Sequence, residues 1–419
     1  MLRVSEVLRP LVLPVYLPTL VQSMGMTAML PIIPLIALEL GFSVSQAAAV
    51  TLIGGVLGVL GPIPVGRLMG RVGSRRAIIA TGFIQIVTAV GAFALVRDAL
   101  AGPSGATHQV AFLGVLTVLG LTDQFWIIGR QSYLGAHLPP QHRARGMSIF
   151  GGMFRIGQIL GPAVGGAAIA VGGLPWIYVV HGVGMTLATV LVAWGMLPGD
   201  EAQQRADVGG ADAQPVDVLL IVKAGLATVP LTIGRLARPL IIPLLGASMG
   251  VDAATISFVF AVGAAIEIAM FLPAGALMDQ FGRAAVLVPC LAVMGLAYVF
   301  TAVLVWTIPA EQHATAILTA STIAIALGNG FGAGIVMTLG IDISPEQGRT
   351  RHLAAWNAMQ GFGRLLAPAV VSGVTAIATL AAASAVTGSL AVIASIWAFM
   401  FIPGVTPRPP RGPFSDRGY

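Results

Sequence analysis

Charged residues are scarce in this 419-residue chain, making up 9% of it. Ordinary soluble domains carry about a quarter charged residues, whereas here 57% of the residues are hydrophobic and the mean hydropathy is +0.92. This composition excludes an ordinary soluble domain and indicates a membrane protein. Cysteine is limited to Cys290 and lysine to Lys223. A single cysteine excludes an intramolecular disulfide and a thiolate metal site.

The sequence also lacks the motifs of several other classes of protein. It has no phosphate-binding loop of the Gly-x-x-x-x-Gly-Lys-Ser/Thr type, no metal-spaced His/Cys/carboxylate cluster and no hydrolase nucleophile elbow. We therefore expect no enzyme activity, no cofactor and no metal. The excess of 22 Lys and Arg over 16 Asp and Glu is typical of cytoplasmic loops, which argues against a nucleic-acid partner. The expected partners are protons, a small-molecule substrate and the lipid bilayer, with the chain acting as a monomer.

One stretch of the sequence is present twice. The pattern Pro-x-Gly-x-Leu-Met-x-x-x-Gly begins at Pro64 and again at Pro273, an offset of 209 residues. The same offset relates Gly25 to Gly234 and Gly41 to Gly250. Two homologous halves are therefore predicted, and a parallel duplication of hydrophobic helices is typical of secondary transporters.

Apolar runs long enough to cross a bilayer, about 20 residues each, indicate twelve spans. Their centres lie near Gln22, Leu57, Val87, Asp123, Gln158, Met185, Pro230, Ala264, Met294, Ile325, Pro368 and Ala391. The predicted fold is an all-α polytopic membrane protein with 12 transmembrane helices in two pseudo-symmetric six-helix bundles. The expected divisions are an N-terminal bundle 1–197, a cytoplasmic linker 198–217, a C-terminal bundle 218–405 and a disordered cytoplasmic tail 406–419.

The distribution of arginine between the spans predicts their orientation. Loops that follow even-numbered spans are rich in arginine, whereas the opposite loops hold only Arg97. By the positive-inside rule both termini are cytoplasmic. The alanine-rich and nearly lysine-free composition suggests a bacterium with a GC-rich genome. The expected location is therefore the plasma (inner) membrane of a bacterium, crossed many times by the chain.

The loop after the second span carries the first family resemblance. Residues Gly66 to Arg76 form a glycine-bounded turn with basic residues, and the stretch from Gly275 to Arg283 repeats it. This pattern resembles the loop between helices two and three of the major facilitator superfamily, whose members are transporters. Gly70 stands where the family has an aspartate, so Asp279 in the second copy is the matching acid. The resemblance implies a gating role for Gly66, Gly73, Gly275, Asp279, Gly282 and Arg283.

The fifth span carries a second resemblance. Its sequence Gly157-x-x-x-Gly161-Pro162-x-x-Gly165 is similar to a signature of the drug:proton antiporters of that superfamily, which implies export. The same residues also have a plainer interpretation. Glycines four apart leave one helix face without side chains, which allows close packing of a neighbouring helix, while Pro162 bends the span.

Acidic residues inside the spans are the candidate proton carriers. Asp123 lies near the middle of the fourth span and Glu267 near the middle of the eighth. A charge at the centre of a membrane helix costs at least about 2.5–3.5 kcal/mol, so it is expected to face a cavity or a partner. We assign both residues to proton coupling. The alternative is a structural acid that is permanently protonated or salt-bridged.

Arginines inside the spans are the candidate substrate contacts. Arg130 and Arg155 lie in the fourth and fifth spans, and Arg235 and Arg238 share one face of the seventh. Such a basic patch is suited to an anionic group on the substrate. The arginines could instead neutralise Asp123 and Glu267 from neighbouring helices.

The leading hypothesis from the sequence is a proton-coupled exporter of hydrophobic, amphiphilic or anionic small molecules that works by alternating access. One alternative is a solute:proton symporter that imports an organic acid or a sugar. Another is an uncoupled lipid transporter or a membrane receptor on the same fold.

Overall fold

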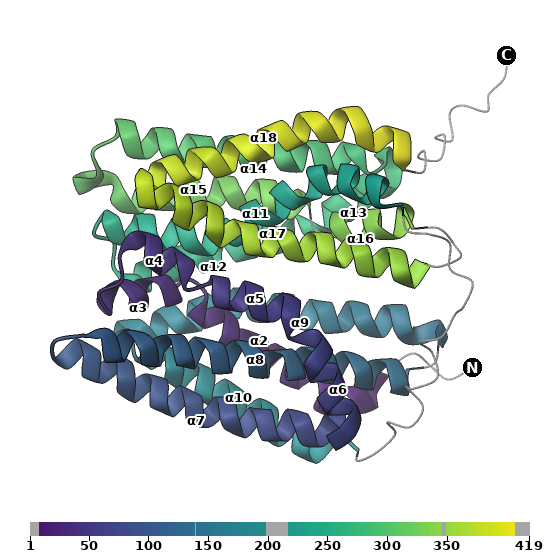
Figure 1. Ribbon diagram of the computed structural model, residues 1–419, viewed down its shortest axis with the longest axis horizontal. Helices are drawn as coiled ribbons and strands as arrows, with labels where there is room; N and C mark the ends of the chain where they lie inside the picture. The colour runs from purple at the N-terminus through teal and green to yellow at the C-terminus, as the bar shows by residue number, and fades with distance from the viewer. Residues whose placement is uncertain (1–7, 139, 198–216, 333, 345–348, 407–419) are drawn as a thin grey trace. The chain divides into compact units, whose positions relative to one another are not determined.

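The computed structural model describes residues 8–138, 140–197, 217–332, 334–344 and 349–406. Within these ranges the chain is built from helices, without strands (Figure 1). The helices are η1 Arg9–Leu11, η2 Val12–Tyr16, α2 Leu17–Met29, α3 Ile33–Glu39, α4 Val44–Ala49, α5 Leu52–Leu60, α6 Pro62–Val72, α7 Ser74–Ala101, α8 Ala106–His137, α9 Pro140–Gly172, α10 Trp176–Gly195, α11 Val218–Ser248, α12 Ala253–Ala269, α13 Phe271–Phe281, α14 Ala284–Thr307, α15 Ala310–Phe331, α16 Ile335–Asp342, α17 Arg349–Ile377 and α18 Leu380–Val405. The predicted linker 198–217 and tail 406–419 lie almost wholly outside the described residues.

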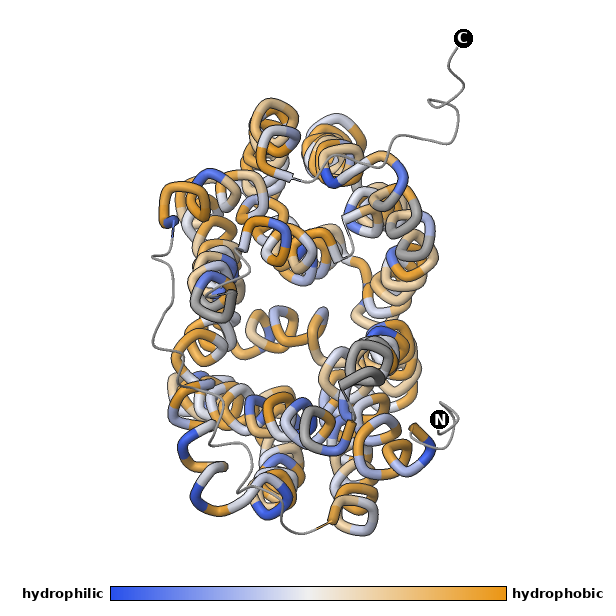
Figure 2. The backbone as a smooth tube through the Cα atoms, turned by 90° about the vertical axis from the view of Figure 1, so that its right-hand side faces the viewer, coloured by the Kyte–Doolittle hydropathy of each residue, from blue (hydrophilic) through white to orange (hydrophobic). Residues whose placement is uncertain are grey.

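The long helices are apolar on all sides. Hydrophobic residues dominate the backbone trace in Figure 2. Large aliphatic side chains lie exposed along these helices, among them Val87 at 70%, Val90 at 68% and Ile393 at 63% exposure. A helix that is hydrophobic all round belongs in a large protein core or in a membrane, and exposed side chains of this kind require an apolar solvent. The helices are therefore those of a membrane protein.

Nine helical segments in the described part of the chain are long and apolar enough to cross a membrane. A tenth results if the segments Val44–Leu60 and Pro62–Val72, which meet at a bend of 56°, form one span. The 17-residue α12 is apolar but shorter. The predicted spans around Leu57 and Ala264 therefore correspond to broken or short helices. The predicted span around Pro368 lies in α17, which is not among these segments, so the total of twelve stays a prediction.

The chain divides into two compact units. The first consists of Met1–Gly209 with Val251–Ala261, and the second of Gly210–Gly250 with Val262–Tyr419. In the first unit α2 packs against α9 and α10, α10 packs against α7, and α7 against α8 (Figure 1). In the second unit α14 packs against α15 and α18, and α11 against α17 and α18. In each unit the first long helix thus lies among the others, where its polar side chains find partners.

The internal repeat is visible in the backbone of each unit. Gly41 and its repeat mate Gly250 have φ angles of 81° and 76°, and Gly73 and Gly282 have angles of 94° and 88°. Positive φ is a conformation that side chains other than glycine rarely adopt. The duplicated glycines therefore end corresponding helices in the same way, which supports the pseudo-symmetry predicted from the sequence.

Candidate functional site

Asp123 on α8 is joined to α2 by a glutamine. Nε2 of Gln22 donates a hydrogen bond of 2.5 Å to Oδ1 of Asp123. The Oε1 atom of the same amide accepts from Nη2 of Arg130, which lies two turns further along α8. Gln22 therefore lies between the acid and the arginine and bonds to both. An amide suits this position because it presents one donor end and one acceptor end.

Arg130 has its side chain fixed by α2 and α8. Its Nε donates to the carbonyl of Trp126 at 2.8 Å, and its Nη1 donates to Oγ1 of Thr19 at 2.9 Å. The rings of Trp126 and Phe150 lie 5.4 Å and 5.7 Å from the guanidinium carbon. The residue is 1% exposed. Arg130 is thus a positioned, buried charge rather than a side chain open to a solute.

The glycine stripe of α9 contacts α2. A Cβ added at Gly157 would lie 2.6 Å from Oγ of Ser23, and one at Gly161 would lie 2.8 Å from the backbone nitrogen of Ala28. Thr27 donates to the carbonyl of Gly157 at 2.9 Å, which shows how close the backbones are. At Gly165 the nearest neighbour is a side-chain atom, Cδ1 of Ile177 at 2.8 Å, and the backbone oxygen of Ala28 lies further away at 3.4 Å. The close approach expected from the sequence is present.

Two other residues singled out from the sequence also lie on α9. Pro162 lies inside the helix, as predicted, and Arg155 is half-buried. α2 thus contacts α9 at the glycine stripe and contacts α8 through Thr19 and Gln22, which bind Arg130.

Arg238 and Glu267 form an ion pair between α11 and α12 in the second unit. Nη1 of Arg238 donates to Oε1 of Glu267, and the side chains are 6% and 21% exposed. Gly263, one turn before Glu267, gives the arginine room, because a Cβ there would lie 3.4 Å from Nη1 and 2.7 Å from Cγ2 of Thr322. The alternative in which an arginine neutralises Glu267 from a neighbouring helix therefore describes Arg238.

Arg235, one turn before Arg238, binds a different element. Its Nε donates to Oδ1 of Asn329 and its Nη2 to the carbonyl of Gly332, both at 2.6 Å. These acceptors lie where α15 ends and α16 begins, at a break that contains Gly334 with φ of 82°. The two arginines of the basic patch predicted on α11 therefore bind different partners: Arg238 binds an acid, and Arg235 binds two neutral groups.

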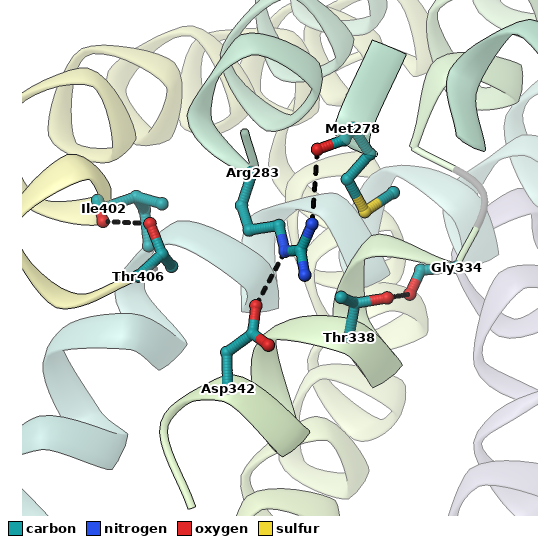
Figure 3. Close-up of polar contacts among 7 residues, drawn as sticks. All are labelled: Met278, Arg283, Gly334, Thr338, Asp342, Ile402 and Thr406. Carbon is teal, nitrogen blue, oxygen red and sulfur yellow. Dashed lines mark hydrogen bonds and ion pairs between the residues drawn. The ribbon is translucent and has the colours of Figure 1, made fainter. Parts of the chain in front are cut away.

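The repeated loops carry the residues expected to act in gating. Gly73 and Gly282 end α6 and α13 with positive φ, while Gly66 lies exposed on α6. In the second copy Nε of Arg283 binds Oδ2 of Asp342 at 2.7 Å, and Nη1 binds the carbonyl of Met278 at 3.2 Å (Figure 3). The side chain of Asp279 and the surroundings of Gly275 lie outside what the structure describes.

The sequence interpretation missed the partners of these charges. Gln22, Asn329 and Asp342 bind the candidate residues but were not assigned to them. Asp342 was detectable in principle as an acid at the end of an apolar run. The amides carried no such signal, because uncharged polar residues are common in membrane helices. Among the described residues no group of three or more His, Cys, Asp or Glu side chains has the arrangement of a metal site.

Comparison with solved structures identifies the fold. A POT family transporter in complex with 5-aminolevulinic acid has a TM-score of 0.72 at 11% identity, covering 94% of this chain and 96% of that one. A D-xylose-proton symporter has a TM-score of 0.70 at 15% identity, covering 94% and 97%. At such low identity these similarities show a shared fold.

Sequence comparison adds one curated relative, the gallate transporter of Pseudomonas putida. It is 28% identical over 180 residues, which amount to 42% of this chain. The match takes in 36% of the relative, so the chain spans about a third of the length of the curated protein that it matches.

The model of the Major Facilitator Superfamily matches residues 15–236 and 224–418. The two matches together take in both copies of the internal repeat and both buried charged clusters. With the helical fold of solved transporters and this family match over nearly its whole length, the chain belongs to the Major Facilitator Superfamily.

Proposed function

We propose that this transporter moves small organic carboxylates together with protons, in the same direction. The ion pair of Arg238 and Glu267 carries the proposal. It is a buried pair of opposite charges in the second unit, with the acid the more exposed partner at 21%. Breaking such a pair by removing one partner is costly, because it leaves an uncompensated charge in a poorly solvated place.

The pair links a proton to an anion by simple charge balance. If a substrate carboxylate binds Arg238, Glu267 loses its counter-charge and takes up a proton. If Glu267 is protonated first, Arg238 is released to bind the anion. Proton and anion therefore favour each other's binding, and such reciprocity between two ligands is a thermodynamic necessity. This sign of coupling favours symport over antiport for an anionic substrate.

Asp123 is proposed as a second proton-coupling residue, in the first unit. It accepts a hydrogen bond from Gln22, and Arg130 binds the other end of that amide. Protonation of Asp123 would remove the negative charge that lies near Arg130 and is linked to it through Gln22. The acid is half-buried, whereas Arg130 is 1% exposed, so the acid is the group that a proton can reach more easily.

The gallate transporter of Pseudomonas putida supports a carboxylate as the substrate, since gallate is an aromatic acid. We also propose that the protein lies in the inner membrane of a bacterium and acts as a monomer. Two bundles, 1–197 and 218–405, would rock about a central site during alternating access.

Proton-coupled export remains the second candidate function. It is supported by the similarity of the Gly157 to Gly165 pattern to the signature of drug:proton antiporters. The observed contacts of Gly157 and Gly161 with α2 also give the pattern a packing role that carries no direction of transport.

The test uses purified protein in proteoliposomes that enclose a pH-sensitive dye. Addition of gallate outside should acidify the lumen of vesicles that contain the wild-type protein. Glu267→Gln should lower this proton movement at least tenfold while gallate exchange continues, because the substituted amide cannot take up the proton. The matched control is Glu39→Gln, a change at an exposed acid at the end of α3.

Each other outcome decides against the proposal in a different way. Proton movement opposite to gallate would establish antiport. Gallate flux without proton movement would establish uncoupled transport. Wild-type proton movement in Glu267→Gln would remove Glu267 from the mechanism, and the same result in Asp123→Asn would remove Asp123.

A further inference from the structure

Arg235 and Arg238 are one turn apart on α11, yet one has an acidic partner and the other has neutral partners. Arg238 is bound to the carboxylate of Glu267. Arg235 is bound to an amide oxygen of Asn329 and a backbone carbonyl of Gly332, both of which are neutral. Three ion pairs in the described part of the chain join His108 to Asp98, Arg238 to Glu267 and Arg283 to Asp342, and Arg235 is in none of these three.

The position of Arg235 makes its positive charge energetically unfavourable. It is the eighteenth residue of the 31-residue α11, one of the helices that can span the membrane, and so lies close to the helix centre. A charge at that depth is unfavourable and normally has a counter-charge or a functional role. Neutral acceptors satisfy two N–H groups but do not cancel the charge. A positive charge kept in this way is offset when an anion binds.

The two bonds of Arg235 also leave a usable edge of its guanidinium group. Nε and Nη2 occupy the side of the group that faces Asn329 and Gly332. Neither bond uses Nη1 or the second hydrogen of Nη2, and these N–H groups point in the same direction on the neighbouring edge of the guanidinium group. Such an edge can bind both oxygens of one carboxylate. The side chain is half-buried, so it is not sealed in the protein interior.

The break between α15 and α16 holds the guanidinium group in place. A Cβ at Gly332 would lie 2.7 Å from Nη2 of Arg235 and would strike Sγ of Cys290, so glycine is needed for this approach. Asn329 and Gly332 thus position the arginine from one side. A rigid guanidinium loses less conformational entropy when it binds a ligand, which favours affinity.

We propose that Arg235 anchors the carboxylate of the substrate beside Arg238, whose ion pair with Glu267 couples that binding to the proton. The proposal rests on the proposed transport of organic carboxylates. The two neighbouring arginines then have different roles. Arg235, called the anchor below, has no acidic partner among the described residues, whereas the charge of Arg238 is balanced by Glu267 until the substrate binds. Asn329 is a positioning residue for the anchor.

The experiment measures binding, so that it does not depend on transport. Isothermal titration calorimetry of the purified protein would compare gallate with its neutral analogue 3,4,5-trihydroxybenzamide. Wild-type protein should bind gallate at least tenfold more tightly than the amide. Arg235→Gln should weaken gallate binding at least tenfold and leave the affinity for the amide unchanged, so that the preference for the acid disappears.

Further variants separate charge, geometry and folding. Arg235→Lys should retain part of the preference, because it keeps the charge but lacks the planar fork. Asn329→Ala should weaken gallate binding less than Arg235→Gln. Arg364→Gln is the matched control, since it removes an exposed arginine from α17, and it should bind gallate as the wild type does. Thermal unfolding of each variant shows whether it is folded.

Three results would overturn the proposal. The first is equal loss of gallate and amide binding in a folded Arg235→Gln protein, which would mean that Arg235 only holds α15. The second is an unchanged preference for gallate over the amide in Arg235→Gln. Complete loss of that preference in both Arg235→Lys and the control Arg364→Gln counts equally against the proposal. The third is absence of any preference in the wild type for gallate or benzoate over the matching amides. Failure of proton coupling with an intact, Arg235-dependent preference would instead contradict only the proposed symport.

Discussion

Buried charged side chains in this protein form hydrogen bonds with neutral side chains as well as ion pairs. Gln22 joins Asp123 to Arg130 with one amide, and Asn329 accepts from Arg235. An amide can satisfy hydrogen-bonding groups while the charges themselves persist. At the scale of single residues, charge is thus kept available where a direct salt bridge would have cancelled it.

Replacement of Gln22 by leucine tests this role. The change leaves both Asp123 and Arg130 short of a hydrogen-bond partner at a buried site, which costs about 1–3 kcal/mol and more for charged groups. We expect a clear fall in the unfolding temperature of the purified protein in detergent. The control is Gln158→Leu, at a half-buried position on α9 for which the structure gives no hydrogen bond. Equal stability of the two variants would contradict the bridging role.

The candidate site was only partly predictable at this scale. Asp123, Glu267 and the arginines stand out because charges are rare in apolar runs. Their pairing did not follow from the sequence, because Arg238 and Glu267 are 29 residues apart and come together only through the packing of α11 and α12. Spacing along one helix is more informative: Asp123 and Arg130 are seven residues apart on α8, about two turns, and Gln22 bonds to both.

Glycine sets the distances between helices at the scale of elements. Gly157 and Gly161 let α9 approach the backbone of α2, and Thr27 then reaches the Gly157 carbonyl. The sequence predicted close packing at this face but not that α2 is the partner, because glycines spaced by four residues mark a helix face without naming its neighbour. It did not predict the break at Gly61 or the short α12, since hydropathy averages over a bend without showing it.

Alanine at Gly161 tests the contact between α2 and α9. The new methyl group would collide with the Met24 carbonyl and lie 2.8 Å from the Ala28 nitrogen, so the two helices would have to separate. Overpacking of this kind costs about 1–3 kcal/mol. We expect Gly161→Ala to lower the unfolding temperature in detergent.

Gly152→Ala is the matched control on the same helix, because a Cβ at Gly152 meets nothing within 4 Å. This variant should be unchanged or slightly more stable, since alanine favours a helix over glycine by up to about 1 kcal/mol. A Gly161→Ala protein of normal stability but altered coupling direction would instead assign the glycine pattern to transport, as the resemblance to antiporters implies.

At the scale of the whole molecule, the two copies of the repeat are more similar in backbone conformation than in the hydrogen-bond partners of their side chains. Thr19 and its repeat mate Thr228 both accept a hydrogen bond from a long polar side chain of another helix. The donor is Arg130 of α8 for Thr19 and Gln360 of α17 for Thr228. The duplication was therefore readable from glycines and prolines, which backbone geometry constrains. The side-chain hydrogen-bond networks of the two copies differ, and their partners could be identified only from the structure.

Orientation in the membrane is the last prediction, and α7 offers a direct test. This helix has 28 residues, about 42 Å at 1.5 Å per residue, which exceeds the hydrocarbon thickness of about 30 Å. Val72, just before it, and Ala101, at its end, are both exposed and should therefore lie on opposite sides of the membrane. The arginine distribution places Val72 on the cytoplasmic side.

Cysteine labelling decides the orientation, because Cys290 is the chain's single cysteine and is buried. In a Cys290→Ala background, a membrane-impermeant maleimide should label Ala101→Cys in intact bacterial cells and label Val72→Cys only after permeabilisation. The opposite pattern would reverse the assignment of both termini. Labelling of both positions in intact cells would show that α7 does not cross the membrane, and would remove the basis for the predicted orientation. The expected pattern fixes which side the loop of Arg71, Arg75 and Arg76 faces, and therefore from which side a proton gradient must drive uptake.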